Sequence, residues 1–202
     1  MKLYDHPASA NCLKPRILLR QLGIPFETET VDLFSGETRR PEHLRRNPDG
    51  RVPVLELDSG DLIPESGAIL LYLAEGTPFL PADPLKRARV HQWLFFEQNQ
   101  VEPGLAVARF QAAIGRVAKA PEVFADRLRQ GRRALESLER GLTADFIAGP
   151  DYTVADIALY AYVHCAEEAG AELTPRVREW LALVEATPGF ENDLAPLAWT
   201  DI

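Results

Sequence analysis

The residues best suited to chemistry lie near the starts of two predicted helices. Ser9 stands between the short apolar run 2–4 and a helix-like stretch at 13–22, and Glu65-Ser66 opens a second helix-like stretch. A hydroxyl at such a position can donate to an anion, and the free N–H groups of a helix start also favour negative charge. Each serine has an ordinary alternative role as a helix N-cap. The pattern indicates two positions that either bind an anion or cap a helix.

Other reactive side chains show no catalytic or metal-binding spacing. Cys12 and Cys165 are far apart and have no metal-ligand company, so each is predicted to be a buried small apolar residue. The histidines likewise lack the neighbours that a metal site or a catalytic triad needs, and core or surface roles are expected for all four: His6, His43, His91 and His164.

Composition excludes several classes of function. The 202 residues carry a net charge of −8 and a pI of about 5.1, so non-specific nucleic-acid binding is not expected. The longest apolar runs, such as 68–74, are far shorter than the ~20 residues that cross a bilayer, and no apolar signal segment is present. A soluble, cytoplasmic protein is expected. Five of the nine basic residues in 1–80 lie between Arg39 and Arg51, a basic island that is typical of a solvated face.

The first 75 residues alternate between strand-like and helix-like runs. Gly23 is placed to close the first helix in the left-handed conformation, and 58–61 reads as a hairpin turn, whereas 35–51 is expected to be irregular. The order of these elements predicts a small α/β domain with a mixed sheet. Strands are predicted at 2–4, 25–32, 54–57 and from 62, and helices at 13–22 and 66–74.

After a proline-rich linker the pattern becomes helical throughout. A helix is predicted from Asp83-Pro84 to about residue 119, with a kink at Pro103-Gly104. Further helices are predicted from 121, from 153 and over 175–186. Thr153 and Asp156 have the spacing of a capping box.

Three segments together resemble the glutathione transferase family. They are 7–16 (PASANCLKPR), 47–55 (NPDGRVPVL) and 64–70 (PESGAIL). The resemblance implies a glutathione transferase fold: an α/β thioredoxin-like N-terminal domain and an all-α C-terminal domain. The implied boundaries are 1–76 for the glutathione-binding domain, 77–84 for the linker and 85–202 for the helical domain.

The resemblance also implies how glutathione would be held. Pro53 is cis in the family, and the backbone of Val52 pairs with the cysteinyl unit. Ser66 binds the γ-glutamyl carboxylate and Glu65 the γ-glutamyl ammonium. Arg51 is placed to reach the glycyl carboxylate.

The contact to the glycyl carboxylate has more than one candidate residue. Many relatives carry a histidine where this chain has Thr38, and Arg39 is the alternative partner for the same carboxylate.

Ser9 is implied to be the catalytic residue. Its hydroxyl would donate to the sulfur of glutathione, whose pKa is ~8.5 when it behaves like free cysteine. Lowering that pKa by ~2 units needs only ~2.7 kcal/mol, which a hydrogen bond to the anion and a helix end can supply. Asn11 is an alternative donor. Cys12, at the second place of a Ser9-Ala-Asn-Cys12 motif that resembles the thioredoxin Cys-x-x-Cys, is another alternative through a mixed disulfide.

The implied activity is conjugation of glutathione, used as a co-substrate without a metal, to a hydrophobic electrophile. A homodimer acting in detoxification is expected, with no nucleic-acid or membrane partner. The alternatives are glutathione-dependent peroxide or disulfide reduction on the same fold, and a non-catalytic glutathione-fold binding protein. The electrophile is not specified by the sequence, and its pocket is expected between the domains, lined by Phe95, Phe96, Gln98, Asn99, Glu102, Phe110 and Ile114.

Overall fold

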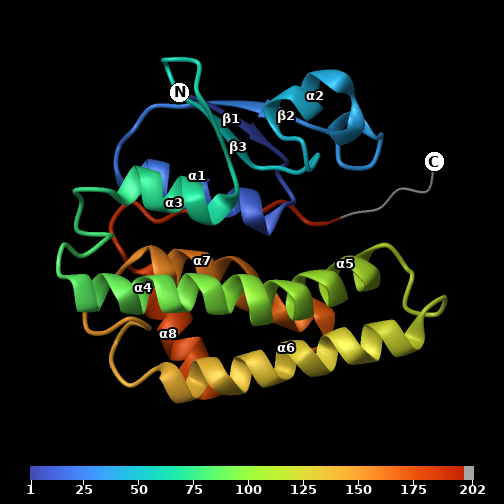
Figure 1. The fold of residues 1–202 in the computed structure, drawn as a ribbon. Helices are drawn as coiled ribbons and strands as arrows, with labels where there is room; N and C mark the ends of the chain where they lie inside the picture. The colour runs from blue at the N-terminus through green and yellow to red at the C-terminus, as the bar shows by residue number, and fades with distance from the viewer. Residues whose placement is uncertain (198–202) are drawn as a thin grey trace. The chain divides into compact units, whose positions relative to one another are not determined.

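The computed structural model describes residues 1–197 and divides them into two compact units (Figure 1). The first unit comprises Met1–Glu75 together with Pro188–Ala195, and the second comprises Gly76–Thr187 and the described residues that follow Ala195. The return of Pro188–Ala195 to the first unit has no signal in the sequence pattern. The domain boundaries implied by the resemblance, 1–76, 77–84 and 85–202, stay a prediction.

The first unit is built on a four-stranded mixed sheet of order β2-β1-β3-β4. β1 pairs in parallel with β2 and antiparallel with β3, and β3 and β4 form an antiparallel hairpin. The βαβ–ββα order predicted from the sequence is therefore confirmed. The strands are β1 (Lys2–Asp5), β2 (Glu27–Thr30), β3 (Val54–Glu56) and β4 (Leu62–Pro64).

Helices α1 (Ala10–Gln21) and α3 (Ser66–Ala74) pack against each other beside this sheet (Figure 1). The α3 bounds agree with the prediction, whereas α1 begins three residues earlier because Ser9 caps it. Gly23 adopts φ +64° after α1, as predicted. The prediction of an irregular stretch at 35–51 was wrong in part, because it contains a 3₁₀ turn η1 (Glu37–Arg39) and a short helix α2 (Pro41–Arg46).

The second unit is helical in every regular element that the described residues contain. Its first helix is not continuous to residue 119 as predicted. It passes from α4 into a π-helical segment that contains Pro103 and ends with α5 at Ala113. The elements are α4 (Pro84–Phe96), η2 (Glu97–Ala106), α5 (Val107–Ala113), α6 (Pro121–Gly141), α7 (Val154–Val163), η3 (Ala166–Ala169) and α8 (Pro175–Glu185).

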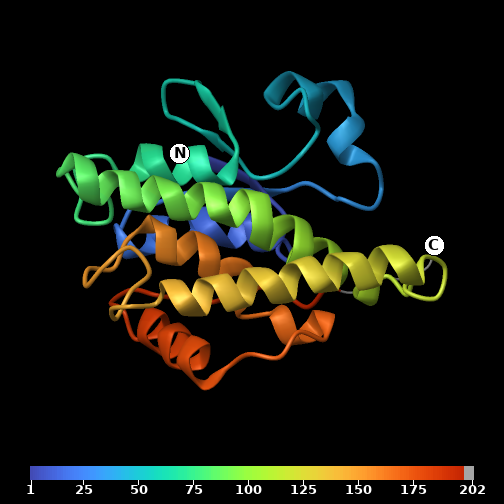
Figure 2. The same cartoon turned by 60° about the horizontal axis from the view of Figure 1, so that its bottom comes forward.

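Close packing and capping hold this helical unit together. α6 runs beside η2 (Figure 2), and a Cβ on Gly104 would lie 2.5 Å from the backbone nitrogen of Gly131, so glycine is required at position 104 for this approach. The predicted capping box is confirmed: Thr153 accepts from the helix backbone, and Asp156 accepts from the Thr153 N–H at 3.0 Å. Asp156 is fully buried and also accepts from the indole N–H of Trp180 at 3.0 Å. No described helix is long and apolar enough to cross a membrane.

Candidate functional site

Ser9 ends the loop between β1 and α1 and caps the helix. Its φ and ψ are −87° and 116°, and its Oγ accepts from the backbone N–H of Cys12 at 3.4 Å. Capping uses an oxygen lone pair, so the hydroxyl proton remains available for donation. The two roles foreseen for Ser9, helix cap and hydrogen-bond donor to an anion, are therefore compatible.

Asn11 lies in the first turn of α1, and its orientation is fixed by Lys14. Lys14 Nζ donates to Asn11 Oδ1 at 2.7 Å, and the Lys14 side chain is fully buried. An ammonium can only donate, so the Asn11 atom facing it must be the oxygen. Within the described residues, no hydrogen bond to the chain involves the Asn11 NH₂ group, which is left as a donor. The sequence named Asn11 but gave no signal for Lys14.

Ser66 connects the starts of α3 and α1. Its Oγ lies 3.5 Å from Asn11 Oδ1, and the residue is 4% exposed. Ser66 does not cap α3 as the sequence allowed: it is the first helical residue, and the preceding Glu65 occupies the N-cap position without a capping side chain. The two serine-bearing segments recognised in the sequence therefore meet through Asn11.

Glu65 has an unusual backbone. Its φ is +71° and its ψ is 116°, and it is the only non-glycine residue in the described chain with positive φ. Such a conformation costs of order 1–3 kcal/mol and persists where a function or its surroundings require it. The carboxylate is exposed at the start of α3, beside the buried hydroxyl of Ser66.

The segment before β3 presents an open backbone position. The Val52–Pro53 peptide bond is cis. The carbonyl of Arg51 accepts from His43 Nε2 at 3.0 Å and from the Asn47 side-chain amide at 3.0 Å. Because the C=O and N–H of one peptide point in opposite directions, fixing the Arg51 carbonyl also aims the N–H of Val52 away from His43 and Asn47. Within the described residues, neither the N–H nor the C=O of Val52 is hydrogen-bonded to the chain.

His43 is a positioning residue that sequence reasoning missed. It was expected to fill a core or surface role, and it is buried, at 2% exposure. A carbonyl oxygen can only accept, so Nε2 carries the proton and donates to Arg51. His43 lies on α2, four residues before Asn47 at the C-cap, so both side chains that donate to the Arg51 carbonyl come from the same end of this helix. Nothing in the sequence indicated this arrangement, because α2 itself was not predicted.

The basic island does not form one cluster for a ligand. Arg39 donates to the carbonyl of Asp49 at 3.0 Å, and Arg46 packs 4.1 Å from the ring centre of Tyr4. Thr38, at the position of the family's histidine, is buried. Arg51 is exposed, and its side chain makes no hydrogen bond or ion pair within residues 1–197. The remaining members pair locally: Arg40 with Glu37 at 3.2 Å and Arg45 with Glu42 at 4.0 Å.

Both cysteines are free and buried, as predicted. Cys12 is fully buried, and burial raises the pKa of its thiol strongly. Burial also raises the pKa of Cys165 to about 12. Inaccessible, protonated thiols are poor nucleophiles, so the Cys12 environment does not favour the mixed-disulfide alternative.

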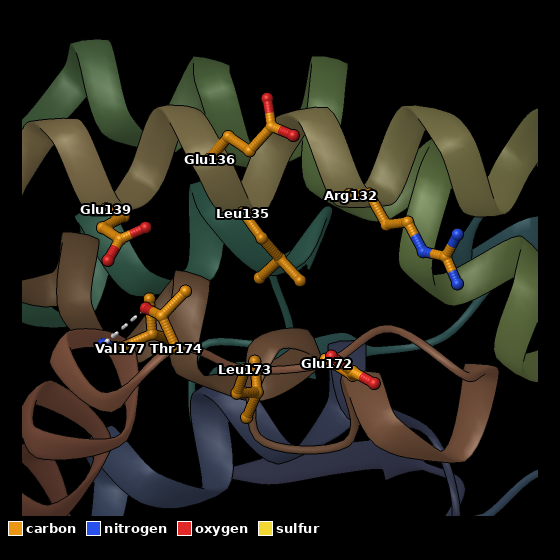
Figure 3. Close-up of a pocket in the computed structure, with 8 residues that line it drawn as sticks. All are labelled: Arg132, Leu135, Glu136, Glu139, Glu172, Leu173, Thr174 and Val177. Atoms are coloured by element: carbon orange, nitrogen blue, oxygen red, sulfur yellow. Dashed lines mark hydrogen bonds between the residues drawn. The ribbon is translucent and has the colours of Figure 1, made fainter.

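A pocket of about 410 Å³ lies in the helical unit (Figure 3). Side chains of α6 face the segment 172–174 and the start of α8 across it. Its charged groups are Arg132, Glu136, Glu139 and Glu172, and the remaining lining residues are Leu135, Leu173, Thr174 and Val177. None of the predicted site residues lines it. In residues 1–197 no group of three His, Cys, Asp or Glu side chains is arranged to hold a metal ion.

Comparisons with known proteins agree on one family. The family model for the glutathione S-transferase N-terminal domain matches residues 1–75. Glutathione S-transferase D7 of Drosophila melanogaster is 31% identical over 206 residues, covering 98% of this chain and 90% of the relative. Maleylacetoacetate isomerase of Rhizobium meliloti is 35% identical over 179 residues, covering 85% of this chain and 84% of the relative.

Solved structures agree as well. A glutathione S-transferase from Pseudomonas fluorescens has a TM-score of 0.93 and 40% identity, covering 96% of this chain and 98% of that one. A glutathione transferase family member from the same species, solved with two glutathione bound, has a TM-score of 0.81 and 27% identity. The match covers 93% of this chain and 89% of that one. The chain belongs to the glutathione S-transferase family. Its fold is the one predicted, and it is a glutathione transferase by enzyme class.

Proposed function

We propose that the first unit binds glutathione as co-substrate across the starts of α1 and α3 and the open edge at Val52, and that Ser9 stabilises the bound thiolate. The observation that carries the proposal is the 3.5 Å contact between Ser66 and Asn11, because it brings the proposed γ-glutamyl and thiolate positions onto adjoining helix starts. The glutathione bound to the 27% identical Pseudomonas fluorescens family member supports the ligand.

The γ-glutamyl end carries one negative and one positive charge, and this pair matches Ser66 and Glu65. The carboxylate would accept from the Ser66 hydroxyl and from the free N–H groups of α3, a nine-residue helix. The ammonium would face the Glu65 carboxylate, which the positive φ of that residue holds at the helix start. The ligand carboxylate then has hydrogen-bond donors, and the ligand ammonium has a carboxylate of opposite charge.

The cysteinyl unit would pair with the N–H and C=O of Val52, and the anchored Arg51 carbonyl aims that N–H. Such backbone pairing resembles the addition of a short strand. For the glycyl carboxylate we propose Arg51. The guanidinium of Arg39 is used by Asp49 and Thr38 is buried, whereas the Arg51 side chain is exposed.

For the thiolate, we propose that Ser9 donates its hydroxyl proton to sulfur and that Asn11 is a second donor through its NH₂ group. A donor to the charged form lowers the pKa of the thiol. The helix N-terminus adds to the effect in the same direction. Glutathione would then attack a hydrophobic electrophile as the thiolate, and we extend this to a cytoplasmic homodimer acting in detoxification.

Isothermal titration calorimetry with glutathione tests the site directly. Saturable binding by the wild-type protein, weakened about 5- to 100-fold by Glu65→Ala, is expected when the carboxylate pairs with the ammonium. Glu75→Ala, at an exposed position beyond the other end of α3, is the matched control and should bind like wild type. Absence of saturable heat at millimolar glutathione would contradict the proposal, and a monomeric mass by light scattering would contradict the dimer.

A second candidate is glutathione-dependent isomerisation, favoured by the 35% identity to a maleylacetoacetate isomerase. Peroxide or disulfide reduction with glutathione also remains an alternative on this fold. One screen with aryl halides, organic peroxides, glutathionyl disulfides and cis-unsaturated diketo acids separates them. Conjugate formation with an aryl halide supports the leading proposal, and turnover confined to the other substrates contradicts it.

A further inference from the structure

The segment Pro188–Ala195 leaves the helical part of the chain through a turn at Pro188-Gly189 and continues without regular secondary structure beside α1 (Figure 1). Its last residue touches the loop that carries Ser9. The backbone N–H of Ala195 donates to the carbonyl of Pro7 at 3.0 Å, two residues before Ser9. A stretch near the end of the chain therefore contributes directly to the position of the β1–α1 loop.

Arg16 makes the second connection to the same loop. Its side chain is 3% exposed, and Nη1 donates to both carboxylate oxygens of Asp5, at 2.8 and 2.7 Å. Nε donates to Asp193 Oδ1 at 2.8 Å, and Nη2 donates to the carbonyl of Pro7 at 3.3 Å. One guanidinium thus ties together the end of β1, the loop and the returning segment.

Asp193 is itself held from two sides. Its second carboxylate oxygen accepts from Arg20 Nη2 at 2.6 Å, in addition to the bond from Arg16. Burial alone would raise the pKa of Asp193, but the two arginines outweigh burial and lower it. Asp193 therefore stays ionised near neutral pH and keeps Arg16 oriented.

The loop is also restrained on either side of Pro7. The His6 ring contacts the Phe34 ring at 5.8 Å, and the Ser9 carbonyl accepts from the backbone N–H groups of Cys12 and Leu13 at 3.0 Å each. Ser9 N–H donates to the carbonyl of His6 at 2.9 Å, and Ala8 N–H donates to His6 Nδ1 at 3.3 Å. Both bonds are internal to the loop, so they fix its shape rather than its place on the unit. The Pro7 carbonyl is where donors from outside the loop, Ala195 and Arg16, act on it.

We propose that Pro188–Ala195 is a positioning strap for thiolate stabilisation: Ala195 and Asp193, the latter through Arg16, fix the Pro7 carbonyl and thereby the place of the Ser9 hydroxyl. The proposal rests on the proposed role of Ser9. None of the strap residues is assigned a contact with glutathione. A small displacement of a donor weakens its bond to the thiolate and raises the thiol pKa, while the γ-glutamyl contacts at α3 are unaffected.

Two variants test the strap. Ala195→Pro removes the N–H donor without changing charge, and Ala195→Gly keeps the donor as the matched control. Asp193→Asn removes the carboxylate charge and one acceptor oxygen and so weakens the bonds from Arg16 and Arg20. Glu191→Gln, at an exposed acid of the same strap that pairs with Arg20 at 3.2 Å, is its control. Asp193→Asn removes one negative charge, which by electrostatics alone would lower the thiolate pKa. A raised pKa in this variant therefore reports displacement of the loop.

The readouts are the pKa of bound glutathione, from the ultraviolet absorbance of the thiolate against pH, and the separate kcat and KM of an aryl-halide reaction. We expect Ala195→Pro and Asp193→Asn to raise that pKa by about half a unit or more, to lower kcat about threefold at pH 6.5, and to change KM for glutathione less than about twofold. The two controls should match wild type.

Unchanged or lowered thiolate pKa in a folded Ala195→Pro protein overturns the proposal, even when its melting temperature falls. Should Ala195→Pro not fold, Asp193→Asn decides by the same criterion. Ser9→Ala, measured in parallel, separates the two levels of inference. No pKa change in Ser9→Ala removes the proposed role of Ser9, whereas a change in Ser9→Ala without one in the strap variants removes the strap alone.

Discussion

The imidazole Nε2 of His43 donates a 3.0 Å hydrogen bond to the carbonyl oxygen of Arg51. The Asn47 amide donates to the same oxygen, so the peptide that carries the Val52 N–H is held by two side chains from the end of α2. A helix that is absent from the sequence prediction thus orients the backbone proposed to pair with glutathione.

His43→Leu should raise the KM for glutathione about 5- to 10-fold, since it removes one hydrogen bond worth ~1 kcal/mol and loosens the Arg51–Val52 peptide. The kcat at saturating glutathione should stay within about twofold of wild type, because the thiolate contacts are elsewhere. Steady-state kinetics with varied glutathione measure both. His43→Gln, which retains a donor, should recover most of the affinity, and equal KM values in wild type and the leucine variant would refute the positioning role.

Ser9→Ala should raise the pKa of bound glutathione by about 1–2 units and lower kcat at neutral pH correspondingly. It also removes a helix cap, which costs ~1 kcal/mol of stability. Ser9→Thr keeps both the hydroxyl and the cap, and should retain a low thiolate pKa. A pH–rate profile of Ser9→Ala that overlays the wild-type profile would transfer the role to Asn11 or to the backbone of α1.

Lys14→Met should act on the thiolate through Asn11, in addition to the rise in thiol pKa that follows from losing a buried positive charge. Without the ammonium, the Asn11 amide can turn and present its oxygen, an acceptor that disfavours an anion. We expect the thiolate pKa to rise by about half a unit or more in Lys14→Met and to show no further rise when Asn11→Ala is added. A double-mutant cycle on the thiolate absorbance measures this coupling, and strictly additive shifts would count against it.

Glu65→Gly should separate stability from binding. Glycine adopts positive φ without strain, so thermal unfolding is expected to show a gain of about 1 kcal/mol, within the range for backbone strain at a single residue. Glutathione affinity should fall, since the carboxylate for the ammonium is lost. Glu65→Gln keeps a Cβ on the strained backbone and serves as control for stability. A glycine variant no more stable than wild type would contradict the prediction.

Stability should fall as the pH is lowered from about 7 to below 6. Burial lowers the pKa of both His6 and His164 in the folded protein. The unfolded chain then binds more protons than the folded chain over this range. The histidine contribution to the free energy of unfolding is therefore fully present above the pKa of the unfolded histidines, and it is lost as the pH falls to the lower pKa of the folded ones. Urea unfolding at several pH values measures the slope. His6→Gln and His164→Gln should each flatten it, and a slope unaltered by both substitutions would rule out this origin.

The fold could be predicted largely because its signals are local. Pro-Glu-Ser before an apolar run gave α3 its observed bounds, and Thr153 and Asp156 gave the capping box. α2 was missed because six residues, half of them charged, show no apolar stripe. The π-helical segment η2 was missed because proline signals a kink without specifying the hydrogen-bond pattern that accommodates it.

The sequence predicted those residues of the proposed site that lie within a short motif. The sequence named Ser9, Asn11, Val52, Pro53, Glu65 and Ser66, each within a few residues of a helix or strand start. It did not reveal Lys14, His43 or Asp193. Lys14 is three residues from its partner Asn11, but nothing in the sequence indicates that this lysine is buried. His43 acts from α2, which was not predicted, and Asp193 meets Arg16, which is 177 residues away. A charged residue far along the chain gives no local indication of its partner.

The burial of Cys12 and Cys165 has a consequence for an enzyme that handles electrophiles. Thiols with raised pKa and little solvent access do not compete with glutathione for a reactive substrate. We therefore expect little alkylation of the protein's own thiols during turnover, and maleimide should label them only as fast as the chain unfolds around them.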